Sequence, residues 1–258
     1  MSAKKILILR TAGTNCDLET EHGFQLAGAE PERVHINRLL DGSVSLADYA
    51  MLVIPGGFSY GDDLSAGKVL ANEMRFKLKD RLTEFVEKGR SVIGICNGFQ
   101  VLVKTGLLPF SRQPEKSTAT LTFNDSGRFE DRWIYLRCTG RSPLLAGLAG
   151  DVITLPVAHG EGKFLTRRPA DFERLRENGQ IAFQYANENG TPAVEYPANP
   201  NGSPAAIAGV TNEAGNVLGM MPHPERFLRP VLHPRWTRGE GNGSDGLRLI
   251  KSLVGYLR

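Results

Sequence analysis

The segment Ser91–Leu102, with the sequence SVIGICNGFQVL, constrains the fold of this chain more than any other stretch. An apolar run rich in β-branched residues ends at Ile95, and Cys96 follows at once. After the cysteine, apolar residues recur at the spacing of one helix face. The pattern therefore predicts a strand, a sharp turn that carries Cys96, and a helix.

Gly94 and Gly98 flank the cysteine and give the motif G-x-C-x-G. This motif is the cysteine counterpart of the nucleophile elbow, in which small neighbours let the backbone turn sharply and present a nucleophile above the sheet edge. The N-terminus of the following helix would favour a thiolate at Cys96. A buried structural cysteine at the end of a strand fits the same spacing, so the motif alone leaves both interpretations open.

The first 110 residues alternate between strand and helix patterns. Such alternation is typical of a doubly wound, mostly parallel α/β sheet with flanking helices, which binds ligands at the carboxyl ends of its strands. Strands are predicted at Lys5–Arg10, Val34–Arg38 and Met51–Ile54, and one helix from Asp17 to Ala27. A single long helix closed by Gly89 is predicted from the apolar stripe Leu70, Met74, Leu78, Leu82 and Phe85.

The second half of the chain adds short strands separated by Gly, Asn and Pro. They are predicted at 119–123, 133–138, 152–157, 181–185, 206–211 and 216–221, followed by a loop over 228–244 and a helix over 246–257. Hairpin-like turns are expected at 187–190 and 212–216. Neither repeats nor a long linker interrupts the chain, so residues 1–258 are expected to form one domain.

Charge and cysteine usage exclude several classes of function. The net charge of +3 is scattered rather than gathered in a basic stripe, which makes nucleic acid a poor candidate partner. Three widely spaced cysteines, Cys16, Cys96 and Cys138, indicate neither a disulfide framework nor a metal site. Signal and membrane-spanning segments are not predicted, so the expected location is the cytoplasm. Cys16 lacks a clean elbow pattern and is predicted to be structural.

A thiol nucleophile needs a base within reach, and the base needs an orienting group. His223 follows a predicted strand end between two prolines, with Glu225 two residues on. In extended backbone, residues two apart project to the same side, and Pro224 disfavours helix at His223. The sequence therefore predicts an imidazole–carboxylate pair here, and His159 beside Glu161 is the main alternative base.

Several motifs in one order resemble a known family. G-x-C-x-G-x-Q at 94–100 and H-P-E at 223–225 are similar to the class I, or triad, glutamine amidotransferases. The resemblance narrows to the separate glutaminase subunit of phosphoribosylformylglycinamidine synthase, an enzyme of purine biosynthesis, and covers nearly the whole chain. It is carried by the segments Gly13–Asp17, Pro55–Asp62, Gly94–Gln100, Ala158–Gly162, Asn199–Ser203 and Gly219–Arg226.

The resemblance implies that the chain hydrolyses glutamine to glutamate and ammonia. Cys96 would attack the side-chain amide carbon, His223 would move the proton, and Glu225 would orient the imidazole. The resemblance and the position after the elbow point to the backbone N–H groups of Asn97 and Gly57 as the oxyanion site. Gln100 and Gly160 would hold the amino-acid end of the substrate.

The chain carries no recognisable ATP motif, although making an amidine from an amide requires activation by ATP. The stretch Gly61–Lys68 fails as a phosphate loop because its first glycine is misplaced and Val69 stands where Ser or Thr would bind magnesium. No cofactor of the chain itself is expected. The resemblance implies a larger synthetase subunit that binds ATP and magnesium, and a small third subunit. The loop Leu228–Gly243 departs from the typical subunit and leaves the partner geometry open.

Two other functions are weighed against this one. Related cysteine hydrolases of the peptidase-like and chaperone-like α/β families generally place a histidine directly after the elbow cysteine, where this chain has Asn97. A binding subunit with an inactive triad would be expected to lack one of the three catalytic residue types, and all three are present. Both alternatives are therefore less well supported than a glutaminase.

Overall fold

The structure is a computed structural model that describes residues 4–111, 118–139, 141–240 and 243–257. Its centre is a nine-stranded sheet with the order β2-β1-β3-β4-β11-β10-β9-β6-β7, and β5 and β8 form a separate pair. The strands are β1 Lys5–Arg10, β2 Glu30–His35, β3 Met51–Ile54, β4 Ser91–Ile95, β5 Ala119–Thr122, β6 Glu130–Cys138, β7 Val152–His159, β8 Lys163–Thr166, β9 Ile181–Ala186, β10 Ile207–Thr211 and β11 Val217–Met220.

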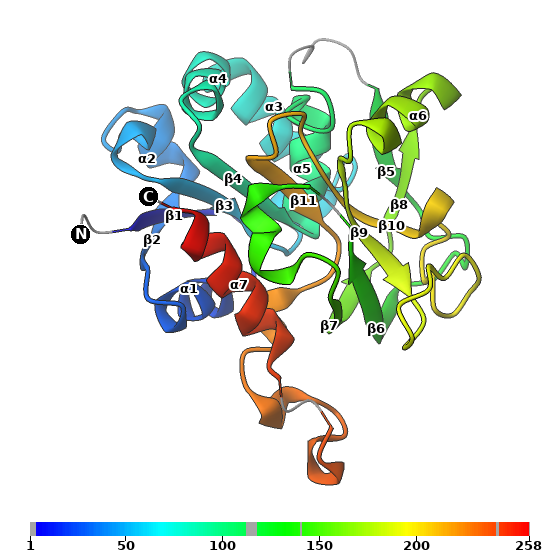
Figure 1. The fold of residues 1–258 in the computed structure, drawn as a ribbon. Coiled ribbons are helices and arrows are strands. Elements are labelled where there is room, and N and C mark those ends of the chain that lie inside the picture. Colours follow the sequence, from blue (N-terminus) through cyan, green and yellow to red (C-terminus); the bar gives the residue numbers. More distant parts are fainter. Residues whose placement is uncertain (1–3, 112–117, 140, 241–242, 258) are drawn as a thin grey trace.

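The α-helices flank this sheet. They are α1 Asp17–Leu26, α2 Ile36–Leu40, α3 Lys68–Lys77, α4 Lys79–Glu87, α5 Asn97–Thr105, α6 Pro169–Glu177 and α7 Asp245–Tyr256. Figure 1 shows α7 in front of the sheet beside α1, with α5 behind it. Gly23 of α1 lies against Ile250 of α7, and Gly219 of β11 lies against Phe99 of α5. Helices thus cover both faces, as the predicted doubly wound α/β fold requires.

The sheet has a parallel part and an antiparallel part. Strands β2, β1, β3, β4 and β11 pair in parallel, whereas β11, β10, β9, β6 and β7 pair with alternating direction. Following these pairings, only β10 and β6 run against the other strands of the nine-stranded sheet. The predicted mostly parallel sheet, extended by short strands from the second half of the chain, is therefore confirmed.

The edge strand β7 lies close to the middle strands of the sheet. β7 lies at the end of the strand order, yet its Pro156 carbonyl accepts a hydrogen bond of 2.9 Å from the N–H of His223, which follows the central strand β11. The Ala158 carbonyl of β7 is 3.6 Å from Sγ of Cys96, which follows β4. The antiparallel part therefore curls over the carboxyl ends of the parallel strands and closes one side of the site.

Two local predictions in the first half were wrong. The second strand covers Glu30–His35 rather than Val34–Arg38, because the His35 ring accepts a 3.2 Å hydrogen bond from the Asn37 N–H and caps the short helix α2. The predicted single helix is divided into α3 and α4 at Leu78, whose φ of −122° is not helical. All five residues of its apolar stripe are nevertheless buried, so the bend preserves the predicted packing face.

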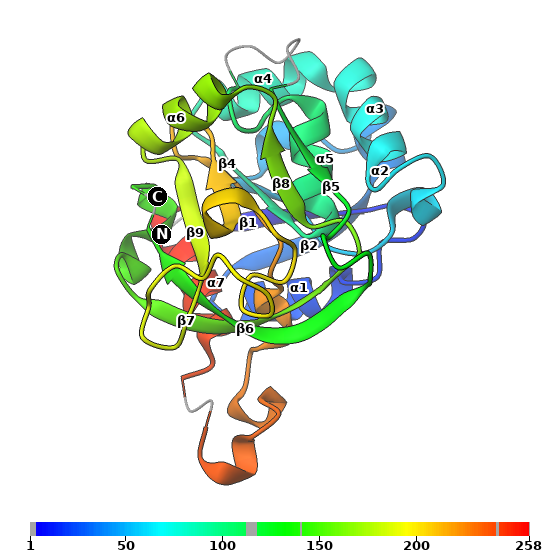
Figure 2. The same cartoon turned by 90° about the vertical axis from the view of Figure 1, so that its right-hand side faces the viewer.

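The second half contains two elements that the sequence patterns do not predict. Strand β8 pairs with β5, and α6 begins with Pro169 at its first turn. The hairpin turn at 212–216 was correctly predicted, since it joins the antiparallel strands β10 and β11. Figure 2 shows α6 and the β5–β8 pair beside the main sheet.

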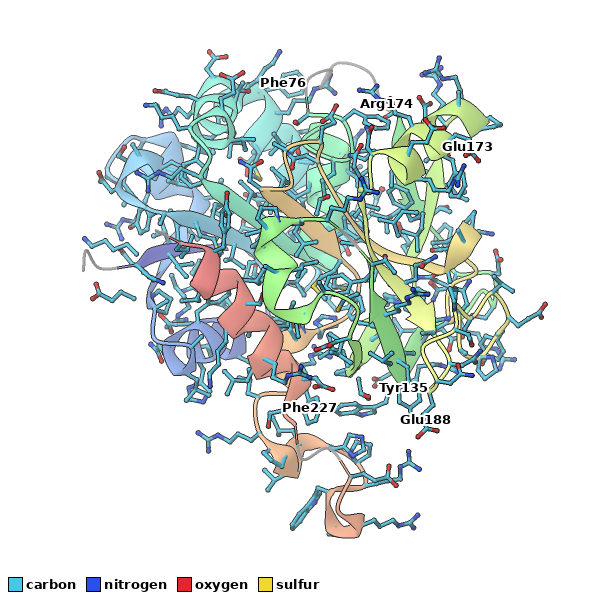
Figure 3. All side chains as sticks on the ribbon, viewed as in Figure 1. Phe76, Tyr135, Glu173, Arg174, Glu188 and Phe227 are labelled. Atoms are coloured by element: carbon cyan, nitrogen blue, oxygen red, sulfur yellow. The ribbon has the colours of Figure 1, made fainter. Side chains whose placement is uncertain are left out.

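The segment 229–240 extends away from the body of the molecule as an arm with two short 3₁₀ turns (Figures 1 and 2). Phe227 lies at its base (Figure 3), where its ring packs at 5.0 Å from that of Trp133. His233 of the arm packs edge-on against the Trp133 ring and at a tilt against the Phe227 ring. Residues 241 and 242 of the predicted loop lie outside the described part of the chain.

Among the helices that the structure describes, none is long and apolar enough to cross a lipid bilayer.

Candidate functional site

Cys96 occupies the predicted elbow between β4 and α5. Its backbone has φ of +51° and ψ of −106°, a conformation that side-chain-bearing residues rarely adopt. The N–H of Cys96 donates a 2.7 Å hydrogen bond to the Met220 carbonyl of β11, which anchors the turn to the centre of the sheet. The residue is only 7% exposed, yet it lines a cavity that opens to solvent.

The two glycines of the motif are required by close packing. A Cβ at Gly98 would stand 1.9 Å from the Ile54 carbonyl oxygen of β3, and one at Gly94 would stand 2.6 Å from the Gly98 oxygen. Both distances are far below contact range, and both involve backbone atoms that cannot move aside. The two glycines of the motif are therefore needed because α5 packs directly against the backbone of β3 and β4.

His223 and Glu225 lie at the carboxyl end of the neighbouring strand β11. The Nδ1 atom of His223 is 2.6 Å from Oε1 of Glu225, and both side chains are buried. The predicted pair exists, but its geometry differs from the prediction. His223 is extended, whereas Pro224–Arg226 form a 3₁₀ turn that brings the carboxylate back to the ring.

The charge of the imidazole is set by its neighbours. Burial alone would lower the pKa of His223, but the Glu225 carboxylate and the Cys96 and Cys16 thiols outweigh it and raise the pKa well above the ordinary value. Its Nε2 atom is buried and makes no well-formed hydrogen bond within the described residues. This nitrogen is the ring position that the bond to Glu225 leaves free.

Cys16 lies at the same imidazole, whereas its sequence context predicts a structural cysteine away from the site. Its Sγ, a ring nitrogen of His223 and a carboxylate oxygen of Glu225 all lie within 4.8 Å of one another. A signal for this placement exists in the sequence. Cys16 follows the first parallel strand, and residues at the carboxyl ends of adjacent parallel strands share one edge of the sheet.

His159, the alternative base, is held in a neutral state. Its Nδ1 lies 3.0 Å from the Asn124 side-chain oxygen, which also accepts from the Gly162 N–H, while the Asn124 amide nitrogen donates to two carbonyls. These bonds place the ring proton on Nδ1. Burial and the nearby His223 lower the pKa of His159 to about 3. A group this weakly basic is a poor proton acceptor, which favours His223 as the base.

The predicted substrate-binding residues surround Cys96 in different ways. Gly57, in the loop after β3, lines the cavity with a φ of +137°. Asn97 turns its side chain away, accepting from Ser59 Oγ at 2.7 Å and donating to Asp62 at 3.0 Å. This side chain therefore ties the elbow to the Gly57 loop, and leaves the backbone of Asn97 as the part that borders the thiol.

Gln100 and Gly160 both line the cavity. The Gln100 amide nitrogen donates a 2.6 Å hydrogen bond to the Glu161 carbonyl, and its oxygen accepts from Asn97. Gly160 lines the cavity, and its carbonyl accepts from the Asn124 N–H at 2.9 Å. Gln100 thus holds the loop that follows β7 in place, in addition to lining the cavity.

The cavity has a volume of about 350 Å³ and contains Cys96, His223 and His159 in its wall. The acidic residues Asp62, Asp131 and Glu161 and the basic residue Arg226 also line it. The wall therefore offers both signs of charge to a small zwitterionic ligand. A pocket of this size, with a few convergent polar groups, suits a small metabolite.

Within the described ranges, one group of side chains could offer three ligand atoms to a metal ion. It consists of Cys16, His223 and Glu225. The 2.6 Å separation of the imidazole and carboxylate atoms is a hydrogen-bond distance, whereas two atoms that each bind a metal at about 2 Å stand farther apart. The spacing therefore favours a base and its orienting carboxylate.

Comparisons with known proteins agree with this geometry. A model of the CobB/CobQ-like glutamine amidotransferase domain matches residues 3–257. A phosphoribosylformylglycinamidine synthase subunit PurQ from Dehalococcoides mccartyi is 48% identical over 100% of this chain and 99% of its own length. A protein of the same name from Pyrococcus horikoshii is 39% identical over 98% of this chain and 99% of its own length.

A solved structure is also similar along the entire chain. It is described as PurLQS from Thermotoga maritima and superposes with a TM-score of 0.76 at 31% identity, covering 99% of this chain and 100% of that one.

Proposed function

The chain belongs to the CobB/CobQ-like glutamine amidotransferase family, and we propose that it hydrolyses L-glutamine with Cys96, His223 and Glu225 and delivers the ammonia to a synthetase partner. One observation carries the proposal. A cysteine in a strained elbow and a carboxylate-paired histidine, which are 127 positions apart in the sequence (223 − 96), line one small cavity.

The proposed reaction starts with attack of Cys96 Sγ on the side-chain amide carbon of glutamine. Nε2 of His223 holds the proton that the thiol gives up, which the raised pKa of the ring favours, and Nδ1–H remains bonded to Glu225. The imidazolium then gives that proton to the amide nitrogen, the C–N bond breaks, ammonia leaves, and the acyl group stays on Cys96 as a thioester. A water molecule attacks the thioester while His223 accepts a proton, and glutamate is released as Cys96 is restored.

The negative oxygen of each tetrahedral intermediate would be stabilised by backbone N–H groups of Gly57 and Asn97. Gly57 lines the cavity from the loop after β3, and Asn97 follows Cys96 directly at the first position of α5. Each such donor is typically worth about 10²–10³ in rate. Because backbone groups are preorganised by the fold, they need no rearrangement during the reaction.

The amino-acid end of glutamine would lie against Gln100 and Gly160. The Gln100 side-chain oxygen accepts one hydrogen bond from Asn97 and has a second lone pair for an ammonium donor. Asp62, Asp131 and Glu161 suit the α-ammonium group, and Arg226 suits the α-carboxylate. The cavity thus matches the charges as well as the size of the proposed substrate.

The relatives' names support a role in purine biosynthesis. We propose that the chain is the glutaminase subunit of phosphoribosylformylglycinamidine synthase and that residues 1–258 act as one cytoplasmic domain. A large synthetase subunit, and a small third subunit, would convert formylglycinamide ribonucleotide to formylglycinamidine ribonucleotide. ATP and magnesium would bind to the synthetase, and this chain would need no cofactor. The PurLQS description of the similar structure supports such an assembly.

The test is the Cys96→Ala variant in the reconstituted complex with its synthetase. Glutamine-dependent synthesis should fall by at least about 10³-fold, since the nucleophile is removed. Synthesis from added ammonia should match that of the wild-type complex, because the variant changes only the ammonia source. Loss of both activities, or retention of the glutamine-dependent one, would contradict the proposed role.

A further inference from the structure

Two thiols adjoin one imidazole in this site, and the proposed reaction uses only one of them. Cys96 reaches His223 from the elbow after β4. Cys16 reaches it from the residue that precedes α1, after the carboxyl end of β1. Cys16 is 1% exposed, so its thiol is part of the packed surroundings of the ring rather than a group open to solvent.

The backbone holds Cys16 firmly. Its N–H donates to the Gly56 carbonyl at 3.3 Å, and its own carbonyl accepts from the Thr20 N–H at 3.1 Å and from the Thr20 hydroxyl at 2.5 Å. With both backbone groups bonded, the position of Cβ is determined. The side chain then has few ways to leave the imidazole.

The sulfur is also held by side chains. Its S–H donates to the Asn15 side-chain oxygen at 3.3 Å, and the sulfur accepts from the Arg226 guanidinium at 3.3 Å. The bond to Asn15 uses the S–H proton and the bond from Arg226 uses one sulfur lone pair, so one lone pair is left for the imidazole. A polarisable sulfur with a lone pair left beside the ring is suited to stabilise its positive charge.

Gly56 shows how close this packing is. A Cβ at Gly56 would stand 2.8 Å from Cε1 of His223, 3.3 Å from Nδ1 and 3.3 Å from Sγ of Cys16. The ring edge and the sulfur therefore converge on one point of the backbone that only glycine leaves open. Glycine at this position allows the thiol and the imidazole to pack together against the chain.

We propose that Cys16 is a positioning residue, which holds the His223 imidazole in the orientation that faces Cys96 and stabilises its protonated form. This inference rests on the proposed glutaminase function. The titratable and charged groups around the ring are Glu225 on the same turn, Cys96 at the elbow, Cys16 before α1 and His159 on β7, with Arg226 beside Cys16.

The charge of the ring is consistent with such a role. Burial lowers the pKa of His223, while Glu225, Cys96 and Cys16 each raise it, and the sum lies well above the ordinary value. Removing the Cys16 sulfur takes away one of the raising contributions. The ionisation of His223 should then move to lower pH.

The experiment measures glutamine hydrolysis by the full complex as a function of pH for Cys16→Ala and Cys16→Ser. Cys138→Ala is the matched control, because Cys138 is a buried thiol on β6 whose pKa burial raises to about 12. We expect Cys16→Ala to lower kcat by roughly threefold to tenfold, the size of one lost hydrogen bond, with KM for glutamine unchanged. The imidazole ionisation should shift to lower pH, Cys16→Ser should recover part of both effects, and Cys138→Ala should behave as wild type.

The inference would be overturned if Cys16→Ala and Cys138→Ala gave the same kcat and the same pH profile. It would also be overturned if Cys16→Ser and Cys16→Ala lost kcat equally without a shift in the profile, since that pattern describes packing alone. If Cys16→Ala does not fold, the pH profile of Cys16→Ser decides between the same outcomes. A wild-type complex that does not hydrolyse glutamine would instead overturn the proposed function, and this inference with it.

Discussion

The parallel and antiparallel parts of the sheet contribute differently to the site. Each side chain of the proposed triad follows a parallel strand: Cys96 follows β4, and His223 and Glu225 follow β11. The antiparallel part contributes the wall, through the loop after β7 that contains Gly160 and through the neutral His159. The reactive groups therefore come from the middle of the sheet, and the opposite wall of the cavity comes from β7 at one end of it.

This division has a physical basis. Parallel strands end at the same edge of the sheet. The turns after β1, β3, β4 and β11 therefore place side chains from distant parts of the sequence close together in space. The antiparallel strands reach that edge only because the sheet curls, and the bond from the His223 N–H to the Pro156 carbonyl joins the two parts. We expect substitutions in the parallel part to change kcat or folding, and those in the antiparallel wall to change KM.

The largest effect is expected at the base. His223→Ala should lower kcat by about 10²–10⁴-fold, since it removes the general acid and base. Glu225→Gln should lower kcat less, because orientation contributes less than proton transfer. Steady-state glutaminase kinetics of the two variants would check the order, with retention of the ammonia-dependent activity as the control. The reverse order would point to His159 as the base.

The next largest effect is expected on stability, at the glycine of the elbow that packs against the parallel strand β3. Gly98→Ala places a methyl group 1.9 Å from the Ile54 carbonyl oxygen, and the backbone must move to admit it. We expect a loss of about 3 kcal/mol or more in the free energy of unfolding, measured by urea denaturation. A variant as stable as the wild type would show that α5 is not pressed onto the parallel strands as described.

How much of this the sequence predicts depends on the range of each interaction. The elbow, the α/β alternation and the His223–Glu225 pair are encoded within a few neighbouring residues, and the sequence predicts them. Two other contacts are not local. Cys16 and His223 are 207 positions apart in the sequence (223 − 16), and His159 and Asn124 are 35 positions apart (159 − 124). Such contacts depend on strand order and on the curl of the sheet, which local periodicity does not encode.

The same reasoning explains the errors in secondary structure. β8 is short and α6 is strongly charged, so neither has a clear apolar period. The bend at Leu78 occurs without Gly or Pro, and the apolar stripe continues across it. The stripe was predicted correctly, and the break was not, because the pattern reports the buried face rather than the backbone angle at one residue.

The neutral His159 leads to a prediction about pH and stability. Unfolded His159 would take up a proton near pH 6.5, whereas folded His159 resists it until about pH 3, so its contribution to stability is present above pH 6.5 and is lost as the pH falls. Between about pH 7 and about pH 5 the wild type should lose about 2 kcal/mol more than His159→Asn. Urea unfolding of both proteins at the two pH values checks this. Equal losses would mean that His159 is not held neutral.

The smallest effect is expected in the wall. A Cβ at Gly160 would meet only Phe129 Cδ2, at 3.9 Å, so Gly160→Ala should fold as the wild type does. The added methyl group borders the proposed amino-acid end of glutamine, and we expect KM to rise by about tenfold or less with little change in kcat. Steady-state kinetics decide this. A fall in kcat at constant KM would contradict the division between reactive edge and wall.

The most direct test of the account is covalent labelling of the wild-type complex with diazo-oxo-norleucine, an electrophile that mimics glutamine. Mass spectrometry should locate the adduct on Cys96, and excess glutamine should protect against it, because the elbow thiol is the proposed nucleophile. An adduct on Cys16, or no adduct while the synthetase is present, would show that Cys96 and His223 do not act together as nucleophile and base.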